Sequence, residues 1–528
     1  MFSIKTIPEA LTQRENASLL NSILRGVERE ALRVSPHGEL SQTPHPSSLG
    51  SALTHPLITT DFSEALLEFI TPPTHRLEEL FHYLENVHGF TTNHIGDEIL
   101  WTNSMPCALP DEANIPVGQY GSSHNGKLKT IYRLGLGLRY GRSMQTVSGI
   151  HYNFSLPNAF WAHFHAESNS LLSLESYKNQ RYFDLIRNFR RHYWVLLLLF
   201  GASPAMCASF VKNRPHDLDT LPGEKGYYRP YATSLRMGDL GYQSSAQESL
   251  FVCYNEKQSY VRTLASAILN PYDGYKDIPL KDDQGEYQQL SQGLLQIENE
   301  FYSSIRPKRA AKPGETALMA LHRRGVEYIE VRCLDVNPFS PLGITEQQAC
   351  FLDIFLLYCA LADSPKSNME EGLMIQRNQK RVVNEGRKPG LKLEHFEHGQ
   401  IELDAWLCDL MSALAPVADL LDNAYGSERY SAALAEQLSV SKDFSLTPSA
   451  KLLKKLESAA SYRALTLEMS ASNTEQLRAT NLNNWVLNRF QTIAAESLAK
   501  QAEIEAACDD DFDAFLENYF KQYETLLK

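Results

Sequence analysis

The chain has 528 residues, of which 43% are hydrophobic and 21% are charged, a composition typical of a globular protein and unlike that of disordered or fibrous chains. With 63 acidic and 50 basic residues the net charge is −13, so a broad basic surface for nucleic acid is not expected. No two of the eight cysteines form a CxxC pair, which excludes the common zinc and iron–sulfur spacings and favours reduced thiols in a cytoplasmic protein.

The first predicted strand, residues 24–34, places two carboxylates close together. Because side chains alternate along a strand, Glu28 and Glu30 share the more apolar face, and the opposite face carries three arginines. Two adjacent carboxylates that point inward repel each other and lose hydration, and a bound divalent cation relieves both effects. The alternative is a surface strand of the reversed register, in which the glutamates form salt bridges.

Two further acids occur in the apolar run of residues 59–70, where Asp61 and Glu68 stand seven positions apart. This run is either part of a carboxylate-lined pocket or a helix with one solvated face. The segment that follows, residues 77–87, repeats apolar residues at helical spacing. That spacing predicts an amphipathic helix.

Two glycine-rich segments are similar to nucleotide-binding loops without matching them. Gly121–Leu128 ends in leucine where a phosphate-binding Walker loop needs a hydroxyl group, and Gly135–Tyr140 lacks the third glycine of a dinucleotide fingerprint. We expect both segments to be turns that use flexible glycines.

Residues 149–156 alternate cleanly between apolar and polar side chains, which predicts a strand with His151 and Asn153 on one face. A single histidine on a strand is more often a structural hydrogen-bonding group than a ligand. The longest apolar run, Trp194–Phe200, is far shorter than the roughly 20 residues needed to span a bilayer. We therefore expect a core element there and no membrane segment.

Strands are expected again over residues 294–336. There Glu330 and Arg332 share one face, so that a carboxylate again lies with apolar residues and beside a guanidinium that could hold a phosphate. Farther along, the capping-box pattern Thr345–Gln348 predicts the start of a buried helix that runs through residues 350–362.

The distribution of strands and helices favours an α+β fold. The strands fall in separate blocks with helices between them, and the pattern is almost wholly helical from about residue 403 onward. We expect a catalytic domain over residues 1–400 and a helical C-terminal region over residues 401–528 that packs on it.

The acidic segments could converge on one pocket that holds several carboxylates, one histidine and a nearby arginine. Hard oxygen ligands of this kind suit two or three divalent cations together with a nucleoside triphosphate. No Ser-His-Asp order and no reactive-cysteine pattern competes with this interpretation. The candidate lining residues are Glu28, Glu30, Asp61, Glu68, His151 and Glu330.

Several long segments of the chain resemble the glutamate–cysteine ligases (γ-glutamylcysteine synthetases) of the γ-proteobacterial type. The resemblance runs in order from about residue 24 to residue 390, and the remaining C-terminal part is less distinctive. The segments that carry it are residues 50–72, 144–157, 198–205, 231–236, 296–300, 305–309, 326–332 and 385–390.

The resemblance implies a fold and a reaction. The fold would be related to the catalytic domain of glutamine synthetase, with a curved, mostly antiparallel sheet that forms a funnel, helices on its flanks and a helical C-terminal region. The reaction would join the γ-carboxylate of L-glutamate to the amine of L-cysteine with ATP and Mg²⁺ or Mn²⁺, through a γ-glutamyl phosphate. It gives γ-glutamylcysteine, ADP and phosphate, the first step of glutathione biosynthesis. The length leaves no room for the ATP-grasp module that bifunctional glutathione synthetases append.

The resemblance also implies roles for individual residues. The six residues named above would hold the metal ions; Glu28, Glu330 and Arg332 would be catalytic. Arg332, His151 and Glu68 would contact the nucleotide. A substrate pocket for cysteine would consist of Phe62, Tyr132, Leu136, Gln145, Tyr242 and Tyr302, with Arg236 meeting a substrate carboxylate and weaker roles for Arg306, Lys308 and Arg309.

Partners and alternatives follow from the same resemblance. We expect a cytoplasmic monomer that acts on small molecules, with feedback inhibition by glutathione. The alternatives are a related carboxylate–amine ligase with a different pair of amino acids, and a catalytically silent relative that only binds metal.

Overall fold

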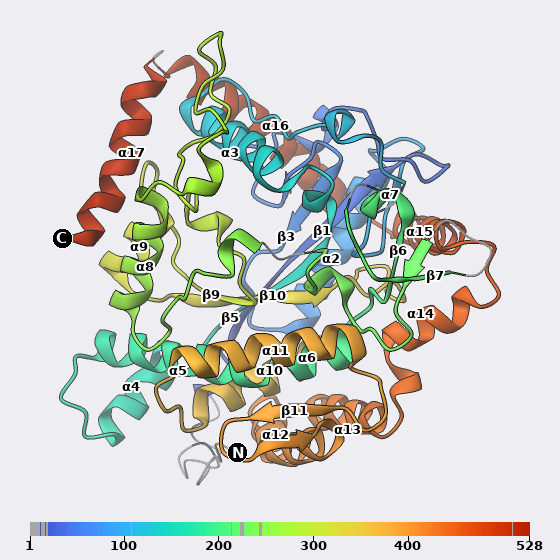
Figure 1. The fold of residues 1–528 in the computed structure, drawn as a ribbon, viewed down its shortest axis with the longest axis vertical. Helices are drawn as coiled ribbons and strands as arrows, with labels where there is room; N and C mark the ends of the chain where they lie inside the picture. The colour runs from blue at the N-terminus through green and yellow to red at the C-terminus, as the bar shows by residue number, and fades with distance from the viewer. Residues whose placement is uncertain are drawn as a thin grey trace.

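A seven-stranded antiparallel sheet lies at the centre of the molecule (Figure 1). The structure, a computed structural model, describes residues 11, 16, 19–106, 108–212, 214–221, 226–241, 245–508 and 511–528. The strands pair in the order β2–β3–β1–β5–β10–β9, and β4 pairs with the end of β1. Their bounds are β1 (Leu24–Val34), β2 (Ile58–Thr60), β3 (Leu66–Ile70), β4 (Ile99–Leu100), β5 (Gly149–Ser155), β9 (Ile305–Lys308) and β10 (Tyr328–Asp335).

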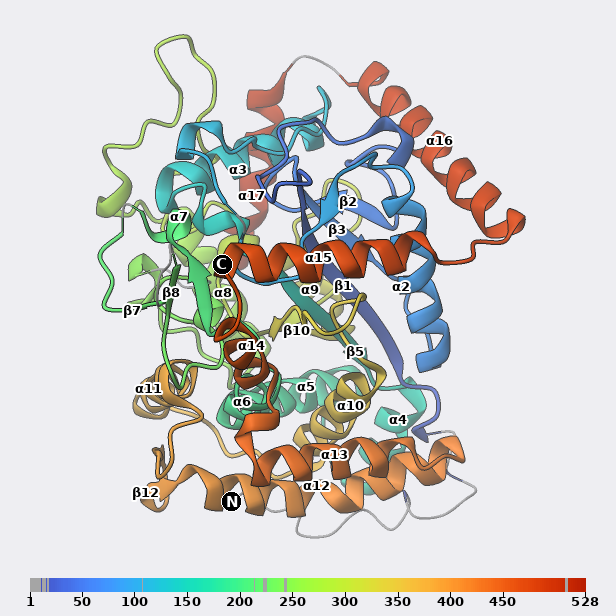
Figure 2. The ribbon, with the colours of Figure 1, turned by 90° about the vertical axis from the view of Figure 1, so that its right-hand side faces the viewer.

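Helices and two small sheets surround this central sheet (Figures 1 and 2). The helices before residue 400 are α2 (Leu77–Thr92), α3 (His124–Tyr140), α4 (Asn158–Glu167), α5 (Leu174–His192), α6 (Trp194–Phe200), α7 (Ala208–Val211), α8 (Lys257–Leu269), α9 (Ala317–Arg324), α10 (Glu346–Leu361) and α11 (Met369–Glu385). The later helices are α12 (Leu403–Tyr425), α13 (Arg429–Lys442), α14 (Pro448–Leu456), α15 (Tyr462–Arg478), α16 (Asn484–Ala506) and α17 (Phe512–Leu527). The small sheets consist of β6 (Ala205–Cys207), β7 (Asp219–Thr220) and β8 (Gly226–Tyr228), and of β11 (Lys392–His395) and β12 (Gly399–Glu402).

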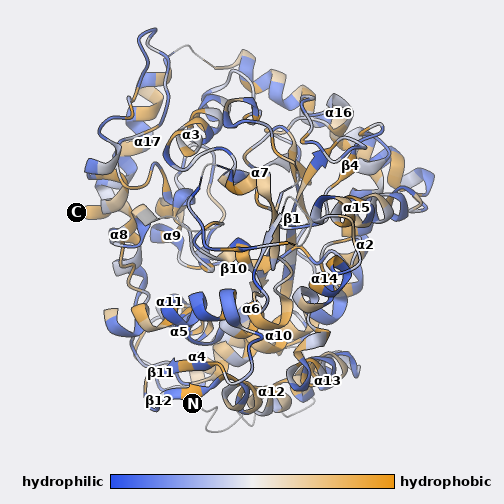
Figure 3. Cartoon of the chain, turned by 45° about the vertical axis from the view of Figure 1, so that its right-hand side comes forward, coloured by the Kyte–Doolittle hydropathy of each residue, from blue (hydrophilic) through white to orange (hydrophobic). Residues whose placement is uncertain are grey.

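One face of the central sheet packs on helices α5, α6 and α10. Helices α6 and α10 are rich in apolar residues (Figure 3), whereas α5 buries one apolar face that includes Phe183 and Ile186. The predicted capping box is confirmed, since the side chains of Thr345 and Gln348 each accept a hydrogen bond from the other residue's backbone N–H. All residues of the apolar run in α6 are buried, as expected of a core element. The predicted α+β class is confirmed. Among the described residues no helix is both long and apolar enough to cross a membrane.

The arginine face of β1 is also buried, which excludes the surface-strand alternative. Arg25, Arg29 and Arg33 are at most 1% exposed. Arg25 Nε lies 2.6 Å from Asp353 Oδ2 in α10, and Arg33 Nη1 lies 2.6 Å from Glu98 Oε2. Pairing with a carboxylate lets Arg25 and Arg33 be buried, and Arg29 donates a hydrogen bond of 2.5 Å to the Pro341 carbonyl oxygen. The glutamate face of the strand is thereby left for a polar pocket on the other side of the sheet.

The expectation of two glycine turns within residues 121–140 was wrong. Gly121 does occupy a turn, with a φ of +83°, but helix α3 begins three residues later and contains the remaining glycines. A Cβ atom on Gly135 would lie 2.2 Å from the side chain of Gln296, and one on Gly137 would lie 3.0 Å from that of Arg142. These glycines let other chain segments pack against the helix backbone, at an intrinsic cost to helix stability of about 1 kcal/mol each.

The second predicted strand block is interrupted. Within residues 294–336 only β9 and β10 are strands of the central sheet, and helix α9 lies between them. The C-terminal helices are spread over several sides of the molecule (Figure 2): α12 and α13 pack on α10, α15 packs on α2 and β4, and α17 packs on α8 and α9. Helix α17 and the end of α16 also contact the start of α3, where Glu505 accepts a hydrogen bond from the Ser122 N–H.

Candidate active site

Polar side chains of three neighbouring strands, β1, β5 and β10, meet on the face of the sheet opposite the helical core. In the pairing of β1 with β5, Glu28 lies opposite His151, and in the pairing of β10 with β5, Glu330 lies opposite Asn153. The clean alternation of β5 sends Tyr152 into the helical core and its polar neighbours to the other side. Strand pairing therefore brings together groups that are more than a hundred residues apart in the sequence.

Glu28 is held from two sides by β5. His151 Nδ1 lies 3.1 Å from Glu28 Oε2, and Asn153 Nδ2 donates a 2.8 Å hydrogen bond to Glu28 Oε1. Burial and the neighbouring Glu330 raise the pKa of Glu28. The hydrogen bond from His151 and the charges of His151 and Lys308 lower this pKa by more, so it lies below its ordinary value. Glu28 is therefore ionised at neutral pH.

Glu330 lies among cationic side chains at the far side of this group. Its carboxylate oxygens lie 3.3 Å from Lys308 Nζ and 3.1 Å from Arg332 Nη1. Burial alone would raise the pKa of Glu330, but Lys308, Arg332 and His151 outweigh it and hold this pKa well below its ordinary value. A fully buried carboxylate is thus kept charged by the groups around it.

A second acidic group lies on the β2–β3 side of β1. Glu30 lies directly opposite Glu68 in the pairing of β1 with β3, and Glu30 Oε2 accepts a 2.6 Å hydrogen bond from the Gly149 N–H. Burial raises the pKa of Glu30, with a contribution from Asp61, although His151 opposes it. Burial and then Glu28, Asp61 and Glu30 raise the pKa of Glu68 well above its ordinary value. Bound cations would relieve this repulsion between neighbouring carboxylates.

The donor set fits divalent cations. One donor atom from each of Glu28, His151 and Glu330 lies within 4.8 Å of the others. His151 Nε2 is buried and makes no hydrogen bond, and it lies 3.5 Å from Glu30 Oε1. Carboxylate oxygens with one imidazole nitrogen suit Mg²⁺ or Mn²⁺ better than a thiophilic metal.

A small pocket of about 70 Å³ adjoins the acidic groups. Glu30, Asp61 and Arg332 form its polar side, and helix α3 contributes its apolar side. Gln145 Nε2 donates a 3.0 Å hydrogen bond to the hydroxyl oxygen of Tyr302 across the pocket. Five of the residues predicted for cysteine binding line this pocket: Phe62, Tyr132, Leu136, Gln145 and Tyr302.

The other predicted substrate residues are placed differently. Arg236 is 1% exposed and donates hydrogen bonds of 3.3 Å to the carbonyl oxygens of Leu334 and Arg332, so it lies behind the pocket rather than in its wall. Tyr242 lies outside the described residues. Arg306 donates to the backbone of Asn299.

Of the remaining basic candidates, Lys308 is the one beside the acidic groups. Arg309 forms a 3.5 Å ion pair with Glu327 and donates to the Arg324 carbonyl oxygen, on the outer part of the fold. The position of Lys308, 3.3 Å from Glu330, makes it the stronger candidate for a role in the site.

Sequence reasoning missed two residues that the structure brings into the site. Arg133 of α3 lines the pocket, donates to the Asp61 carbonyl oxygen and stacks over the ring of Tyr120 at 4.4 Å. The expectation of a turn concealed the helical spacing that puts Arg133 near Tyr132 and Leu136. Asn153 shares a face with His151 in the predicted alternation, and this shared face was sufficient to name Asn153 as a candidate site residue.

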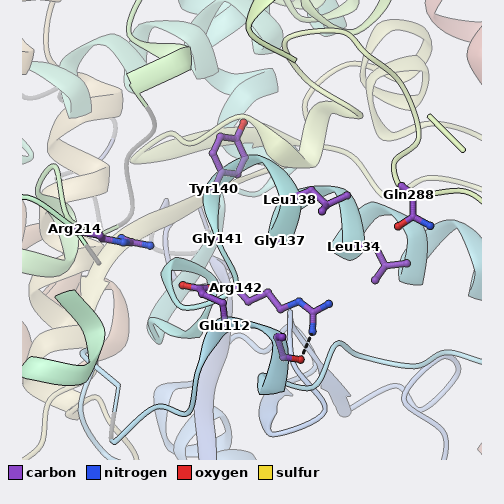
Figure 4. Close-up of a pocket in the computed structure, with 10 residues that line it drawn as sticks. Glu112, Leu134, Gly137, Leu138, Tyr140, Gly141, Arg142, Arg214 and Gln288 are labelled. Carbon is purple, nitrogen blue, oxygen red and sulfur yellow. Dashed lines mark hydrogen bonds between the residues drawn. The ribbon is translucent and has the colours of Figure 1, made fainter. Parts of the chain in front are cut away.

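A larger cavity of about 410 Å³ lies at the end of α3 (Figure 4). Its lining includes Leu134, Tyr140, Arg142 and Arg214, and Arg142 donates a 3.1 Å hydrogen bond to the Ala113 carbonyl oxygen. None of the six candidate metal ligands lines this cavity. The smaller pocket is therefore the stronger candidate for the active site, because Glu30, Asp61 and Arg332 line it.

Comparison with known proteins gives consistent matches over nearly the whole chain. The family model for glutamate-cysteine ligase matches residues 9–382. A glutamate–cysteine ligase from Saccharophagus degradans is 56% identical, covering 99% of each chain, and one from Pseudomonas aeruginosa is 50% identical, covering 96% of this chain and 95% of that protein.

Solved structures give the same result. The crystal structure of a glutamate–cysteine ligase from Francisella tularensis in complex with AMP has a TM-score of 0.90 at 37% identity, covering 96% of this chain and 99% of the other. A bifunctional glutathione synthetase from Pasteurella multocida has a TM-score of 0.70 at 26% identity, covering 92% of this chain and 58% of the other. From these matches, the chain belongs to the glutamate–cysteine ligase family.

Proposed function

We propose that the protein joins the γ-carboxylate of L-glutamate to the amine of L-cysteine in an ATP-dependent reaction that passes through a γ-glutamyl phosphate. The observation that carries this proposal is the junction of two sites. A group of buried carboxylates suited to metal ions adjoins a pocket with apolar walls, and Glu30 and Arg332 belong to both. The first site suits ATP and the second suits a small amino acid.

The acidic groups would hold Mg²⁺ or Mn²⁺ at two positions. Glu28, His151 and Glu330 bring their donor atoms within 4.8 Å of one another and would form one donor group. Glu30, Asp61 and Glu68, whose charges interact, would form the other. Cations held by these residues would supply positive charge where the γ-phosphate of ATP and the anionic carboxylate of glutamate have to meet.

The protein's own residues orient this arrangement. Asn153 and His151 fix the orientation of the Glu28 carboxylate, because each contacts one of its two oxygens. Arg332 lies 3.1 Å from Glu330 and reaches the pocket, so that its guanidinium can contact a phosphate oxygen as phosphate leaves the acyl group. Since most of these groups are buried, water is largely kept from the acyl phosphate, which it would otherwise hydrolyse.

The small pocket would hold the cysteine substrate. Phe62 and Leu136 provide apolar walls for the thiol-bearing side chain, and Gln145 and Tyr302 provide polar groups to orient the amine and carboxylate. By the sequence resemblance, Tyr242 would also contact the cysteine substrate. Arg236 would act on a substrate carboxylate only if the backbone around it moves, since it is 1% exposed.

The proposal extends to the location, oligomeric state and inhibition of the enzyme. We propose a cytoplasmic enzyme that acts as a monomer and is inhibited by glutathione. Sedimentation of the purified protein would test the oligomeric state, and a dose–response measurement with glutathione would test the inhibition.

The decisive experiment measures ATP hydrolysis with each amino acid omitted in turn. We expect ADP formation with Mg²⁺ to require glutamate, and full turnover to γ-glutamylcysteine to require cysteine as well. Full turnover with a different amine in place of cysteine would favour a related ligase, and no turnover would favour a metal-binding relative.

A variant pair tests the metal assignment. Glu28→Gln should reduce turnover by a factor of about 100 or more, because it removes a charged metal ligand while preserving shape. Glu327→Gln is the matched control, since Glu327 is exposed and lies one residue before β10. Binding of Mn²⁺, measured by electron paramagnetic resonance, should weaken in the first variant and not in the second. Equal binding and turnover in both variants would refute the assignment.

A further inference from the structure

A buried polar network lies behind the small pocket and connects it to helix α3. Its centre is Gln247, at the end of the short 3-10 helix Ser245–Gln247, and this side chain is 8% exposed. Gln247 Oε1 accepts a 3.0 Å hydrogen bond from the Tyr302 N–H, and Gln247 Nε2 donates a 2.8 Å hydrogen bond to the Glu300 carbonyl oxygen. One carboxamide thus holds the backbone on both sides of the residue before Tyr302.

Glu300 fastens the same segment to the last turn of α3. Its side chain and that of Arg139 are both fully buried, and Arg139 Nη1 lies 2.9 Å from Glu300 Oε1. The same oxygen accepts a 2.7 Å hydrogen bond from the Tyr140 hydroxyl, and the other oxygen accepts one of 2.7 Å from the Gln296 N–H. Residues 296–302 therefore have a defined position relative to the helix that forms one wall of the pocket.

The network determines where the phenol of Tyr302 lies. Its backbone is held by Gln247, its ring packs edge-on against Tyr140 with centroids 5.7 Å apart, and its hydroxyl meets Gln145 at 3.0 Å. Gln247 Nε2 also lies 3.3 Å from the Tyr140 hydroxyl, so it contacts both partners of the ring pair. In a pocket of about 70 Å³, a small displacement of this phenol changes a large part of the space available to a substrate.

We propose that Gln247 is a positioning residue that determines the affinity of the enzyme for its amino acid acceptor by holding Tyr302 in place. This inference rests on the proposed function of the pocket as the cysteine site. A purely structural role would affect stability and every kinetic constant together, whereas the Gln247 side chain, within the described part of the chain, bonds to the segment that carries Tyr302 and to the end of α3. The effect should therefore fall on one substrate.

The test is steady-state kinetics of Gln247→Leu with each of the three substrates varied. Leucine is similar in size and lacks all three hydrogen bonds. We expect the KM for cysteine to rise about tenfold, the effect of losing one well-placed hydrogen bond, while the KM values for ATP and glutamate and the kcat stay within about twofold of wild type. The preference for cysteine over L-serine should fall as well, because a mobile phenol no longer shapes the pocket.

Controls distinguish the positioning role from loss of structure. Gln437→Leu changes an equally buried glutamine, 4% exposed, in α13, a helix that lines none of the described pockets. It should leave all kinetic constants unchanged. If Gln247→Leu does not fold, Gln247→Glu takes its place, because it keeps the acceptor for the Tyr302 N–H and removes the donor, and the same selective rise in the KM for cysteine is expected.

Tyr302→Phe and Gln145→Leu separate this inference from the proposed function. If both raise the KM for cysteine and the Gln247 variant does not, the positioning role is refuted and the pocket assignment stands. If none of the three variants affects cysteine, the pocket assignment itself fails. An equal loss in all constants together with a lower melting temperature for the Gln247 variant would also refute the positioning role.

Discussion

Replacing Asp353 by leucine should leave a guanidinium buried in the helical core without its carboxylate. Arg25 and Asp353 are both fully buried, and Arg25 Nε lies 2.6 Å from Asp353 Oδ2. Asp353 also accepts hydrogen bonds from the hydroxyls of Tyr152 at 2.9 Å and Tyr430 at 3.3 Å. The carboxylate of Asp353, in α10, thus bonds to side chains of strands β1 and β5 and of helix α13.

The expected loss is large for a single substitution. Removing one partner of a buried pair costs about 3–5 kcal/mol, because the remaining charge stays desolvated and unpaired. Proteins of ordinary stability unfold with about 5–15 kcal/mol, so this one substitution should remove a substantial part of the total. Since Arg25 is three residues before Glu28 on the same strand, loss of activity on mild heating should accompany the loss of stability.

Urea unfolding measures the effect, and a double variant tests its cause. Combining Arg25→Met with Asp353→Leu removes both charges and should restore at least about half of the lost free energy, since buried pairs can often be replaced by apolar side chains of similar volume. Asp513→Leu is the exposed control, because its ion pair with Lys281 lies at the surface, and its unfolding midpoint should match wild type. A loss below about 1 kcal/mol for Asp353→Leu, or a double variant no more stable than that single one, would refute the reasoning.

Three other predictions concern the remaining cations, the thiols and pH. Lys127→Ala should reduce turnover far less than Arg332→Ala, since Arg332 lines the small pocket beside the carboxylates and Lys127 does not. Loss of ATP binding in the Lys127→Ala variant would contradict this. Cys333→Ala should lower the free energy of unfolding in urea by about 1 kcal/mol. Turnover should stay near normal, because burial raises the pKa of this thiol to about 12 and an acyl phosphate route needs no protein nucleophile. A folded but inactive variant would refute that route. Burial lowers the pKa of His55 and of His192 to about 4. As the pH falls from 6.5 towards 4, the two histidines bind protons in the unfolded state but not in the folded state. Each histidine should therefore lower the free energy of unfolding by about 1.4 kcal/mol per pH unit. Urea midpoints that do not fall between pH 7 and pH 5 would contradict this.

Local patterns in the sequence were sufficient to predict several secondary-structure elements. The alternation in β5 correctly separated His151 from Tyr152, because the period of a strand depends only on neighbouring residues. The capping box at Thr345 located the start of α10 within one residue for the same reason: its hydrogen bonds span three positions. Resemblance to a family then indicated residues for the site, and the structure places five of the proposed cysteine-pocket residues around one cavity.

Tertiary packing decided what local pattern could not. Helix α3 contains Gly135 and Gly137, which disfavour a helix locally, and the side chain of Gln296, from a distant part of the chain, packs against its backbone at Gly135. The arginine face of β1 is buried because Arg25 meets Asp353, a residue 328 positions away. The role we infer for Gln247 likewise depends on its bond to Tyr302, 55 positions away. A sequence shows which groups can pair, but the free energy that buries a charge or a carboxamide depends on partners that only the folded chain brings together.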